Sequence, residues 1–339
     1  MYGASKPGLS HPETLRRMIL GFVNSQAVYV AAKLNVADAL GEARLSVEHI
    51  ASEVGAEPQP LYRVLRLLAG LGVLEESEDR IFNLTELGSF LRSDTPSSVR
   101  HAAVMFGELP YQSAGALLHT VQTGETAFDY LYGTGHEPWL EQHPEEATTF
   151  HQAIAQLTQV VDDGILATLN LEGLDVLVDV GGGHGALLAP LLQRWPDLRG
   201  VLFEQESALA GAEVHLRKAG VFARCELVSG DFFDALPSGG AYLLKSVLHS
   251  WPDDLAERIL RTCRDSAAPG AHLYIVERTV PEYGEPLFPK INDLIMLAVT
   301  GGRERTAAEY STILQSAGFK PVDHQATTQG FSLIKGIAS

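Results

Sequence analysis

The chain has 339 residues, which is long for one hydrophobic core and predicts two domains. It carries 25 Lys and Arg against 42 Asp and Glu, a net charge of −17, and this excess of acid argues against a nucleic-acid backbone as the main partner. Its longest apolar runs, such as MILGFV, have six residues, far fewer than the ~20 that a membrane span needs.

Cysteine usage and the first residues bear on compartment and on metal binding. Cys225 and Cys263 are the only cysteines, and two cysteines cannot build a disulfide framework or a multi-cysteine metal site. The sequence does not open with the basic and then apolar stretch of a secretory signal. We therefore expect a cytoplasmic protein, and nothing in the sequence calls for a metal.

The first third of the chain has the outline of a winged helix-turn-helix. Apolar side chains recur at helical spacing up to about residue 40. The next stretch predicts a helix that starts after Ser46, a turn at 55–60, a second helix at about 61–71 and a hairpin whose acidic tip spans 75–79. We expect these elements to form a mainly α-helical domain in residues 1–100.

A winged helix can bind DNA, or it can serve as a packing and dimerisation module. Residues 1–100 hold 10 Lys and Arg against 12 Asp and Glu, and the predicted wing tip carries four acids. A tip that lies beside phosphates needs cations instead. Arg63 and Arg66 on the second helix are common on any solvated helix face. The sequence favours a dimerisation module and leaves a transcriptional regulator as the alternative.

The pattern changes near residue 170. Residues 101–170 predict a mainly helical segment. From about Leu174 onward, apolar strands alternate with helix-like stretches, the strands being DVLVDV, RGVLFE, CELVSGDF, AYLLKSVL and HLYIVERTV. This alternation predicts a doubly wound, mostly parallel, Rossmann-like α/β sheet in residues 171–339.

A glycine-rich turn follows the first of these strands, in VLVDVGGGHGALLAPLL. Gly181 and Gly183 fit a dinucleotide pattern when Ala186 is the third member, and a tighter G-x-G-x-G pattern when Gly185 is the third. Both patterns need a sharp turn without side chains. Open α/β sheets bind ligands at the carboxyl ends of their strands, so the turn predicts a ligand. Spacing alone leaves NAD and S-adenosylmethionine open.

Three acidic residues lie where a ligand of this turn would bind, and the first of them separates the two candidates. Asp179 precedes the glycines, where a carboxylate would repel the pyrophosphate of a dinucleotide. S-adenosylmethionine instead carries an ammonium and a sulfonium, which a carboxylate favours. Glu204 lies 23 residues after Gly181, where a ribose-binding acid is expected for either ligand, and Asp231 could pair with an adenine amino group. Asp179 therefore favours S-adenosylmethionine over the alternative of an NAD-dependent reductase, whereas Glu204 does not discriminate.

His249 is the candidate proton acceptor. It lies in LLKSVLHSWPDD, directly after an apolar strand and at the carboxyl edge of the predicted sheet. An unperturbed histidine has a pKa of about 6.5, so a neutral imidazole there can accept a proton at cytoplasmic pH. Most histidines are surface or core residues, and only the position at a ligand-binding edge favours a catalytic role here.

Taken together, six motifs resemble one known family. LVDVGGGHG, LFE, GDFF, LLKSVLHSWPDD, IVERTVP and NDLIMLAVTGGRERTAAEYSTILQSAGF occur in the order found in the S-adenosylmethionine-dependent O-methyltransferases of the caffeate type. The resemblance is greatest to the bacterial branch that acts on polyketides, phenazines and related natural products. It covers nearly the whole chain and implies that the winged-helix domain mediates homodimerisation.

The resemblance also implies which residues bind the methyl donor and which act on the acceptor. The cofactor set contains Asp179, Gly181, Gly183, Gly185, Glu204, Gln205, Gly230, Asp231, Phe232, Phe233, Lys245, Ser246 and Trp251. His249 falls at the position of the general base. Glu277 in IVERT and Glu304 in GRERT match the two acids that hold this histidine. Ser250 departs from the family, because many relatives have aspartate there.

An acceptor pocket is expected from the middle helices and from a late segment. The candidate residues are Met105, Phe106, Trp139, Phe150 and Ile154 in the middle helices, and Asn292 and Met296 in the late segment. Aromatic and thioether side chains suit a flat aromatic ligand, although at helical spacing they are equally often plain core. Ile154 replaces a methionine that is frequent in the family, which predicts a reshaped pocket.

These inferences predict a homodimeric enzyme that moves the methyl group of S-adenosylmethionine to a hydroxyl of a small aromatic molecule. Neither a nucleic acid nor a membrane is expected as a partner. The identity of the acceptor stays open, and so does methylation of nitrogen or carbon. A further alternative is a family member that binds S-adenosylmethionine but catalyses decarboxylation, hydroxylation or ring formation, since a fold does not fix a reaction.

Overall fold

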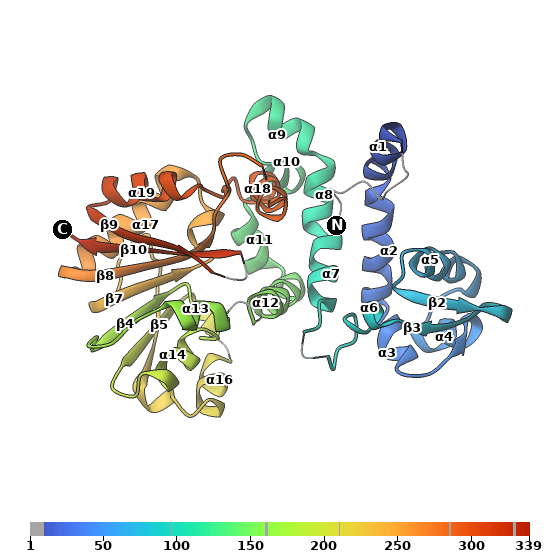
Figure 1. Ribbon diagram of the computed structural model, residues 1–339, viewed down its shortest axis with the longest axis horizontal. Coiled ribbons are helices and arrows are strands. Elements are labelled where there is room, and N and C mark those ends of the chain that lie inside the picture. The colour runs from blue at the N-terminus through green and yellow to red at the C-terminus, as the bar shows by residue number, and fades with distance from the viewer. Residues whose placement is uncertain (1–9, 96, 160–161, 210, 285, 328–329) are drawn as a thin grey trace. The chain divides into compact units, whose positions relative to one another are not determined.

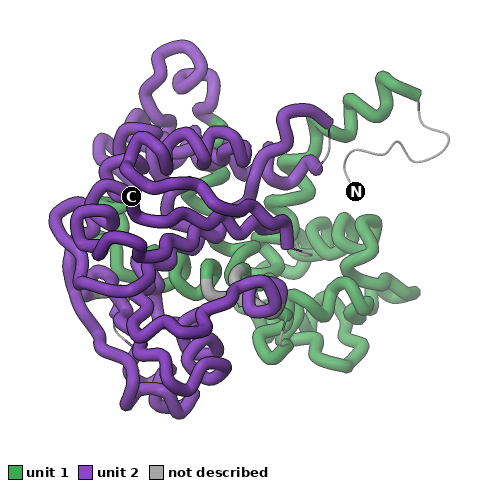
Figure 2. Tube along the Cα trace, turned by 60° about the vertical axis from the view of Figure 1, so that its left-hand side comes forward, with its two compact units in different colours: residues 1–115, 137–158 green, residues 116–136, 159–339 purple. Residues whose placement is uncertain are grey.

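A computed structural model describes residues 10–95, 97–159, 162–209, 211–284, 286–327 and 330–339. The chain forms two compact units, which Figure 2 shows in green and purple. Unit 1 contains residues 1–115 and 137–158, and unit 2 contains residues 116–136 and 159–339. The helical segment 101–170 is therefore shared between the units, an arrangement that the sequence analysis does not predict.

Unit 1 contains the expected winged helix. Three short strands form a sheet in the order β1-β3-β2, with β1 at Leu45–Ser46, β2 at Leu74–Ser77 and β3 at Ile81–Leu84. The helices of this unit are α1 (His11–Ile19), α2 (Gly21–Lys33), α3 (Val36–Leu40), α4 (Val47–Val54), α5 (Pro58–Gly70), α6 (Glu86–Ser89), α7 (Arg100–Gly107), α8 (Leu109–Gly115) and, in the later part, α11 (His136–Gln142) and α12 (Pro144–Gln159) (Figure 1). The fold class predicted for the N-terminal domain is confirmed.

Local sequence explains the helix ends of the winged helix. The Ser46 side chain accepts a hydrogen bond from the His49 backbone N–H and so caps α4. Gly55 ends this helix in the left-handed conformation, which costs glycine little. Along α5, Leu61, Leu65 and Leu68 are buried at helical spacing and pack into the core of the unit.

The first two helices expose an unusual amount of apolar surface. No residue of α1 is buried. Six large apolar side chains between α1 and α2 are at least 41% exposed, namely Leu15, Met18, Ile19, Leu20, Phe22 and Val23. A contiguous apolar surface of this kind marks an interaction site.

Unit 2 is built on a seven-stranded sheet in the order β6-β5-β4-β7-β8-β10-β9. The strands are β4 (Val176–Val180), β5 (Arg199–Glu204), β6 (Cys225–Ser229), β7 (Gly239–Lys245), β8 (Ala267–Arg278), β9 (Phe319–Ala326) and β10 (Phe331–Ala338). The five strands from β6 to β8 in this order are parallel, whereas β10 pairs antiparallel with both β8 and β9. The predicted doubly wound, mostly parallel sheet is confirmed.

Helices cover both faces of this sheet (Figure 1). The helices of unit 2 are α9 (Leu117–Thr123), α10 (Ala127–Tyr132), α13 (Asp162–Thr168), α14 (Leu188–Arg194), α15 (Glu206–Leu209), α16 (Ala212–Lys218), α17 (Asp253–Ser266), α18 (Phe288–Val299) and α19 (Ala307–Ser316), of which α9 and α10 lie away from the sheet. One apolar core joins Val178 and Val180 of β4 to α17 and α19, and the other joins Leu177 to α13, α14 and α16. Successive side chains of β4 thus enter opposite cores, as the period of a strand requires.

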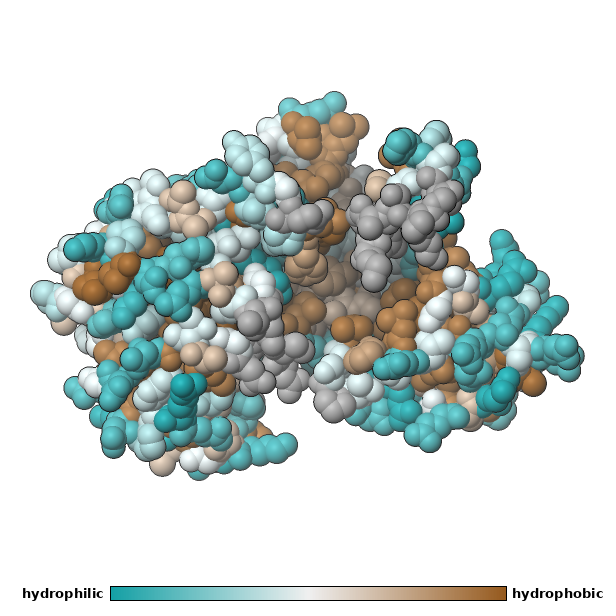
Figure 3. All heavy atoms as spheres, viewed as in Figure 1, coloured by the Kyte–Doolittle hydropathy of each residue, from teal (hydrophilic) through white to brown (hydrophobic). Residues whose placement is uncertain are grey.

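The outer surface of unit 2 carries exposed apolar side chains on α9. Leu118 and Val121 of α9 are 68% and 70% exposed, and apolar side chains gather over this helix at the top of Figure 3. Among the described residues, no helix is long and apolar enough to cross a membrane.

The topology places the glycine turn, Glu204 and Glu277 at one edge of the sheet. Because β6, β5, β4, β7 and β8 are parallel, their carboxyl ends lie at the same edge. The glycine turn follows β4, Glu204 ends β5, and Glu277 is the penultimate residue of β8. The loops after these strands therefore meet at the edge where open α/β sheets bind ligands.

Candidate functional site

The turn after β4 uses the conformational freedom of its glycines. Gly181, Gly183 and Gly185 have φ angles of 69°, 57° and 77°, in the left-handed region that other residues rarely adopt. Gly182 is confined for a different reason. A Cβ there would lie 2.4 Å from Asp179 Oδ2 and 2.6 Å from Leu202 Cδ1. The turn therefore presents bare main chain to whatever binds at this edge.

Glu204 ties the turn to the end of β5. Its carboxylate accepts a hydrogen bond from the Gly183 N–H at 3.0 Å and another from the Gln205 N–H at 2.8 Å. The Gly230 N–H donates to the Glu204 carbonyl at 3.1 Å, so the loop after β6 is fixed to the same strand end. A Cβ on Gly230 would lie 2.7 Å from the ring of Phe203, and only glycine fits there without rearrangement.

An aromatic cluster lies on the loops after β6 and β7. The rings of Phe232, Phe233 and Trp251 meet edge to face, with centroids 4.9 to 5.9 Å apart. The Asp231 carboxylate accepts a hydrogen bond from the Phe233 N–H at 2.8 Å and so fixes this loop. Edge-to-face packing of this kind builds a rigid apolar wall.

The donor-binding residues predicted from the sequence fit a cationic adenosyl ligand without phosphate. Asp179, Glu204 and Asp231 all lie at or next to the carboxyl ends of parallel strands. Lys245, at the end of β7, is the one basic side chain in the predicted cofactor set. Ser246 follows it with a φ of 55°, which is costly for a non-glycine residue and is typical of functional turns. Of these three carboxylates, Asp179 would favour the ammonium and the sulfonium, whereas Glu204 suits a ribose and Asp231 an adenine amino group.

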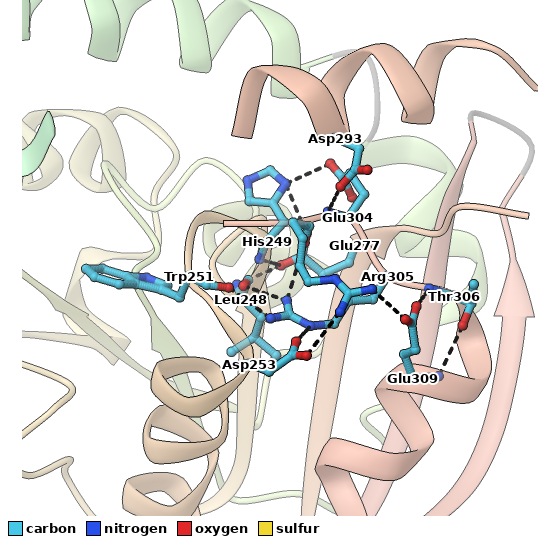
Figure 4. Close-up of polar contacts among 11 residues, drawn as sticks. Leu248, His249, Trp251, Asp253, Glu277, Asp293, Glu304, Arg305, Thr306 and Glu309 are labelled. Carbon is cyan, nitrogen blue, oxygen red and sulfur yellow. Dashed lines mark hydrogen bonds and ion pairs between the residues drawn. The ribbon is translucent and has the colours of Figure 1, made fainter. Parts of the chain in front are cut away.

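His249 lies against two buried glutamates (Figure 4). Its Nδ1 is 3.1 Å from Glu304 Oε1, a hydrogen-bond distance, and 3.6 Å from Glu277 Oε2. The side chain of His249 is 17% exposed, whereas both glutamate side chains are fully buried. The three residues come from segments far apart in the sequence: the turn after β7, the end of β8, and the segment between α18 and α19.

Glu277 also holds the main chain that carries His249. Its Oε1 accepts hydrogen bonds from the backbone N–H groups of Val247, Leu248 and His249, at 2.9, 2.8 and 3.3 Å. A single buried carboxylate therefore both orients the turn and places negative charge beside the imidazole. Ser250, the departure from the family pattern, donates its backbone N–H to the Val247 carbonyl.

Burial and charge shift the proton affinities of this cluster. Burial is the largest influence on the pKa of His249 and lowers it, but the charges of Glu277 and Glu304 and the hydrogen bond to Glu304 outweigh burial, so the pKa is raised. Burial raises the pKa of Glu277 to about 7, although the neighbouring imidazole opposes this rise. The pKa values of His249 and Glu277 are therefore both above their ordinary values, and a raised pKa makes a histidine a better proton acceptor.

The predicted acceptor-pocket residues fall in both units, and their common pocket stays a prediction. In unit 1, Met105 and Phe106 lie on α7, Trp139 on α11, and Phe150 and Ile154 on α12. In unit 2, Asn292 and Met296 lie on α18. The Asn292 amide donates a hydrogen bond to Glu304 Oε1, the oxygen that also faces His249.

Several residues that the sequence analysis did not single out support the site. Asp293 Oδ1 accepts a hydrogen bond from the Glu304 backbone N–H at 2.9 Å. A Cβ on Gly302 would lie 2.2 Å from the His249 carbonyl oxygen. Arg305 is fully buried and contacts the turn that carries His249. Gly302 and Arg305 belong to the GGRERT segment of the last family motif. A glycine and two arginines around a predicted functional acid were therefore the sequence signal for these two residues.

Comparison with known proteins identifies the family. A model of the O-methyltransferase domain matches residues 115–320, and a model of the O-methyltransferase dimerisation domain matches residues 17–94. The phenazine O-methyltransferase PhzM of Lysobacter antibioticus is 40% identical over 322 residues, which cover 95% of this chain and 94% of that protein.

Solved structures agree with this result. The crystal structure of LaPhzM is similar with a TM-score of 0.93 and 39% identity, over 98% of this chain and all of that one. NcsB1, an O-methyltransferase from neocarzinostatin biosynthesis, was solved with S-adenosyl-L-homocysteine and 1,4-dihydroxy-2-naphthoic acid; it is similar with a TM-score of 0.87 and 30% identity, over 99% of this chain and all of that one. The family and methyl donor expected from the sequence motifs are confirmed: the chain belongs to the O-methyltransferase family and is an S-adenosylmethionine-dependent methyltransferase with an O-methyltransferase dimerisation domain.

Proposed function

We propose that the enzyme methylates a hydroxyl group of a small, flat aromatic molecule and that His249 is the general base. The observation that carries this proposal is the hydrogen bond between His249 Nδ1 and Glu304, with Glu277 close by, at the sheet edge that also holds the glycine turn. S-adenosylmethionine supplies the methyl group on a positively charged sulfur. The residues of the chain must position the acceptor oxygen and remove its proton.

Removal of the hydroxyl proton is energetically unfavourable for a histidine by itself. A phenol has a pKa of about 10 and a histidine one of about 6.5, so transfer to an isolated imidazole is uphill. Glu277 and Glu304 stabilise the imidazolium and raise the pKa of His249 against the effect of burial. The raised pKa of His249 therefore lies closer to the pKa of the phenol that gives up the proton.

The two ring nitrogens of His249 have different roles in this proposal. Nδ1 donates its hydrogen to Glu304, which fixes the tautomer and the ring orientation. Nε2 is then the atom that accepts the proton from the acceptor hydroxyl. Glu277 and Glu304 do not take the proton themselves, since they act on the imidazolium, as the carboxylate does in a Ser-His-Asp triad.

The class of acceptor and the oligomeric state follow from separate observations. The relatives named above act on a phenazine or were solved with a hydroxylated naphthoic acid, which supports an aromatic natural-product acceptor. The apolar surface of α1 and α2 and the match to a dimerisation domain support a homodimer.

We also propose a cytoplasmic location, since both cysteines are free and buried.

One pair of measurements tests this function. Wild-type enzyme is incubated with isotopically labelled S-adenosylmethionine and a panel of phenolic, quinone, phenazine and aromatic amine acceptors, and the products are identified by mass spectrometry. We expect methyl ethers of aromatic hydroxyls. Label on nitrogen or carbon only, or no transfer to any acceptor, contradicts O-methylation.

The second measurement concerns the base. His249→Ala should lower turnover by about 10² to 10⁴, while S-adenosylhomocysteine still raises the melting temperature as it does in the wild type and NAD does not. Wild-type turnover in this variant removes His249 from the mechanism. Stabilisation by NAD alone contradicts the donor assignment.

A further inference from the structure

Arg305 is a buried charge to which the proposed mechanism gives no role. Its side chain has no solvent exposure, yet a guanidinium stays protonated in proteins. A buried charge is strongly unfavourable unless it is paired and hydrogen-bonded. Arg305 Nε donates to Asp253 Oδ1 at 2.8 Å, and this carboxylate supplies the opposite charge.

The other donors of Arg305 contact the main chain on both sides of His249. Nη1 donates to the Leu248 carbonyl at 2.9 Å, and Nη2 donates to the Trp251 carbonyl at 2.8 Å (Figure 4). A planar guanidinium presents its donors in a rigid fork, so it fixes the relative position of both carbonyls. A lysine ammonium at the same place could not do so.

The turn from Val247 to Trp251 is therefore held from two sides. The N–H groups of Val247 and Leu248 donate to Glu277. The carbonyls of Leu248 and Trp251 accept from Arg305. The His249 carbonyl itself accepts a hydrogen bond from the Arg303 backbone N–H at 2.9 Å. Two buried charged side chains thus satisfy main-chain groups of this turn in addition to its backbone hydrogen bonds.

Arg305 also changes the electrostatics of the cluster. Burial lowers the pKa of His249 most, Glu277 and Glu304 raise it, and the Arg305 charge lowers it. Two carboxylates without a nearby cation would favour a permanently protonated imidazole, which cannot accept a proton. A positive charge on the far side of the cluster counteracts this effect.

We propose that Arg305 is a positioning residue for methyl transfer, which fixes the turn that carries His249 and places a compensating positive charge beside the His249, Glu277 and Glu304 side chains. The inference rests on the proposed function, because it needs His249 to be the base. Its two contributions can be separated: the fork sets the geometry and therefore turnover, and the charge sets the pH at which the base works.

Two substitutions of Arg305 separate these contributions. Arg305→Lys keeps the charge and loses the fork, so kcat should fall by about 10²-fold, as it does when a reacting group is misplaced by about 1 Å, while the acidic limb of the kcat/KM pH profile stays in place. Arg305→Met loses both the fork and the charge. Its acidic limb should move to higher pH, because His249 then protonates more readily.

Asp253→Asn provides a test that retains the Arg305 side chain and removes the charge of its carboxylate partner. The Asp253 side chain is 54% exposed and starts α17, where an amide is compatible with a helix start. Loss of this negative charge leaves the Arg305 charge uncompensated, so the acidic limb should move to lower pH. Arg261→Met is the control, since Arg261 is 58% exposed and pairs with Glu257 on the outside of the same helix; its profile should match the wild type.

The outcomes decide between the proposal and a purely structural role for Arg305. An acidic limb that stays in place in both Arg305→Met and Asp253→Asn overturns the proposal, and so does wild-type kcat in Arg305→Lys. If Arg305→Met does not fold, the position of the acidic limb in the kcat/KM pH profile of Asp253→Asn decides alone. Failure of the proposed function is distinguishable, because His249→Ala then has wild-type turnover regardless of the Arg305 variants.

Discussion

Asn292 and His249 share one hydrogen-bond acceptor, the Oε1 atom of Glu304. The Asn292 amide donates to this oxygen from α18, and His249 Nδ1 lies 3.1 Å from it. Each donor reduces the negative charge that the other experiences. Asn292, predicted from the sequence as an acceptor-pocket residue, therefore also weakens the interaction between Glu304 and the imidazolium.

This relationship predicts the effect of Asn292→Leu. Loss of the amide leaves Glu304 a stronger partner for the imidazolium, so the pKa of His249 rises and the acidic limb of kcat/KM moves to higher pH. Measured pH profiles and KM values for the acceptor separate two roles. A raised KM with an unmoved limb would assign Asn292 to acceptor binding alone.

Glu277 should tolerate an amide but not truncation. In Glu277→Gln the side-chain carbonyl can still accept from the three backbone N–H groups, so the variant should fold, with lower kcat and an acidic limb at lower pH because the imidazolium loses a carboxylate. Glu277→Ala leaves those buried donors unpaired, at about 1–3 kcal/mol each. Chemical denaturation of both variants checks this, and equal stability of the two would contradict the hydrogen-bonding role of Glu277.

The wild-type enzyme should lose activity as pH falls through a value above the ordinary histidine pKa of about 6.5. The sign follows from the mechanism: only neutral His249 accepts a proton, and its pKa is raised by Glu277 and Glu304 in spite of burial. Initial rates between about pH 5.5 and 9 with a phenolic acceptor measure this limb. A limb below 6.5 would mean that burial outweighs both carboxylates.

Gly302→Ala should disrupt the turn that carries His249. The added Cβ would lie 2.2 Å from the His249 carbonyl oxygen and 2.5 Å from the carbonyl carbon of Ser250, and both are main-chain atoms that cannot move independently. We expect a loss of about 1–3 kcal/mol of stability and a large loss of kcat. Gly70→Ala at the end of α5 is the control, since a Cβ there meets nothing within 4 Å. Equal behaviour of both variants would refute the steric argument.

Gly182→Ala should weaken binding of the methyl donor. Its Cβ would collide with Asp179 and with Leu202 on the neighbouring strand, so the turn must shift. Calorimetric titration with S-adenosylhomocysteine should show a loss of affinity, whereas Gly240→Ala on β7, whose Cβ would come no closer than 3.6 Å to another residue, should bind normally. Unchanged affinity in Gly182→Ala would separate this turn from the donor site.

Much of the fold could be predicted because its signals are local. The alternation of apolar strands with helices predicts a parallel sheet, and parallel strands place the residues that follow them at one edge. Asp179, Glu204, Asp231 and His249 were predicted from their positions at or just after the ends of strands, and the structure places all four at that edge. The glycine turn was predicted from composition, because left-handed main chain favours glycine.

Other features depend on contacts between distant segments. The division of residues 101–170 between two units follows from which surfaces those helices bury, and helical periodicity does not encode a partner. In the same way, Asn292 has the features of a pocket residue in the sequence. Its contact with Glu304 exists only because α18 packs beside the segment that leads into α19.

The two arginines around Glu304 show the limit most clearly. The sequence by itself determined the family motifs, the sheet and the candidate base, but it does not distinguish Arg303 from Arg305, the two arginines on either side of Glu304. The structure exposes 43% of the Arg303 side chain and buries Arg305 completely. Arg303 and Arg305 are two residues apart, a spacing that would put both side chains on the same face of a regular strand. Only the packing of this segment against the His249 turn decides that Arg305 becomes interior while Arg303 stays exposed.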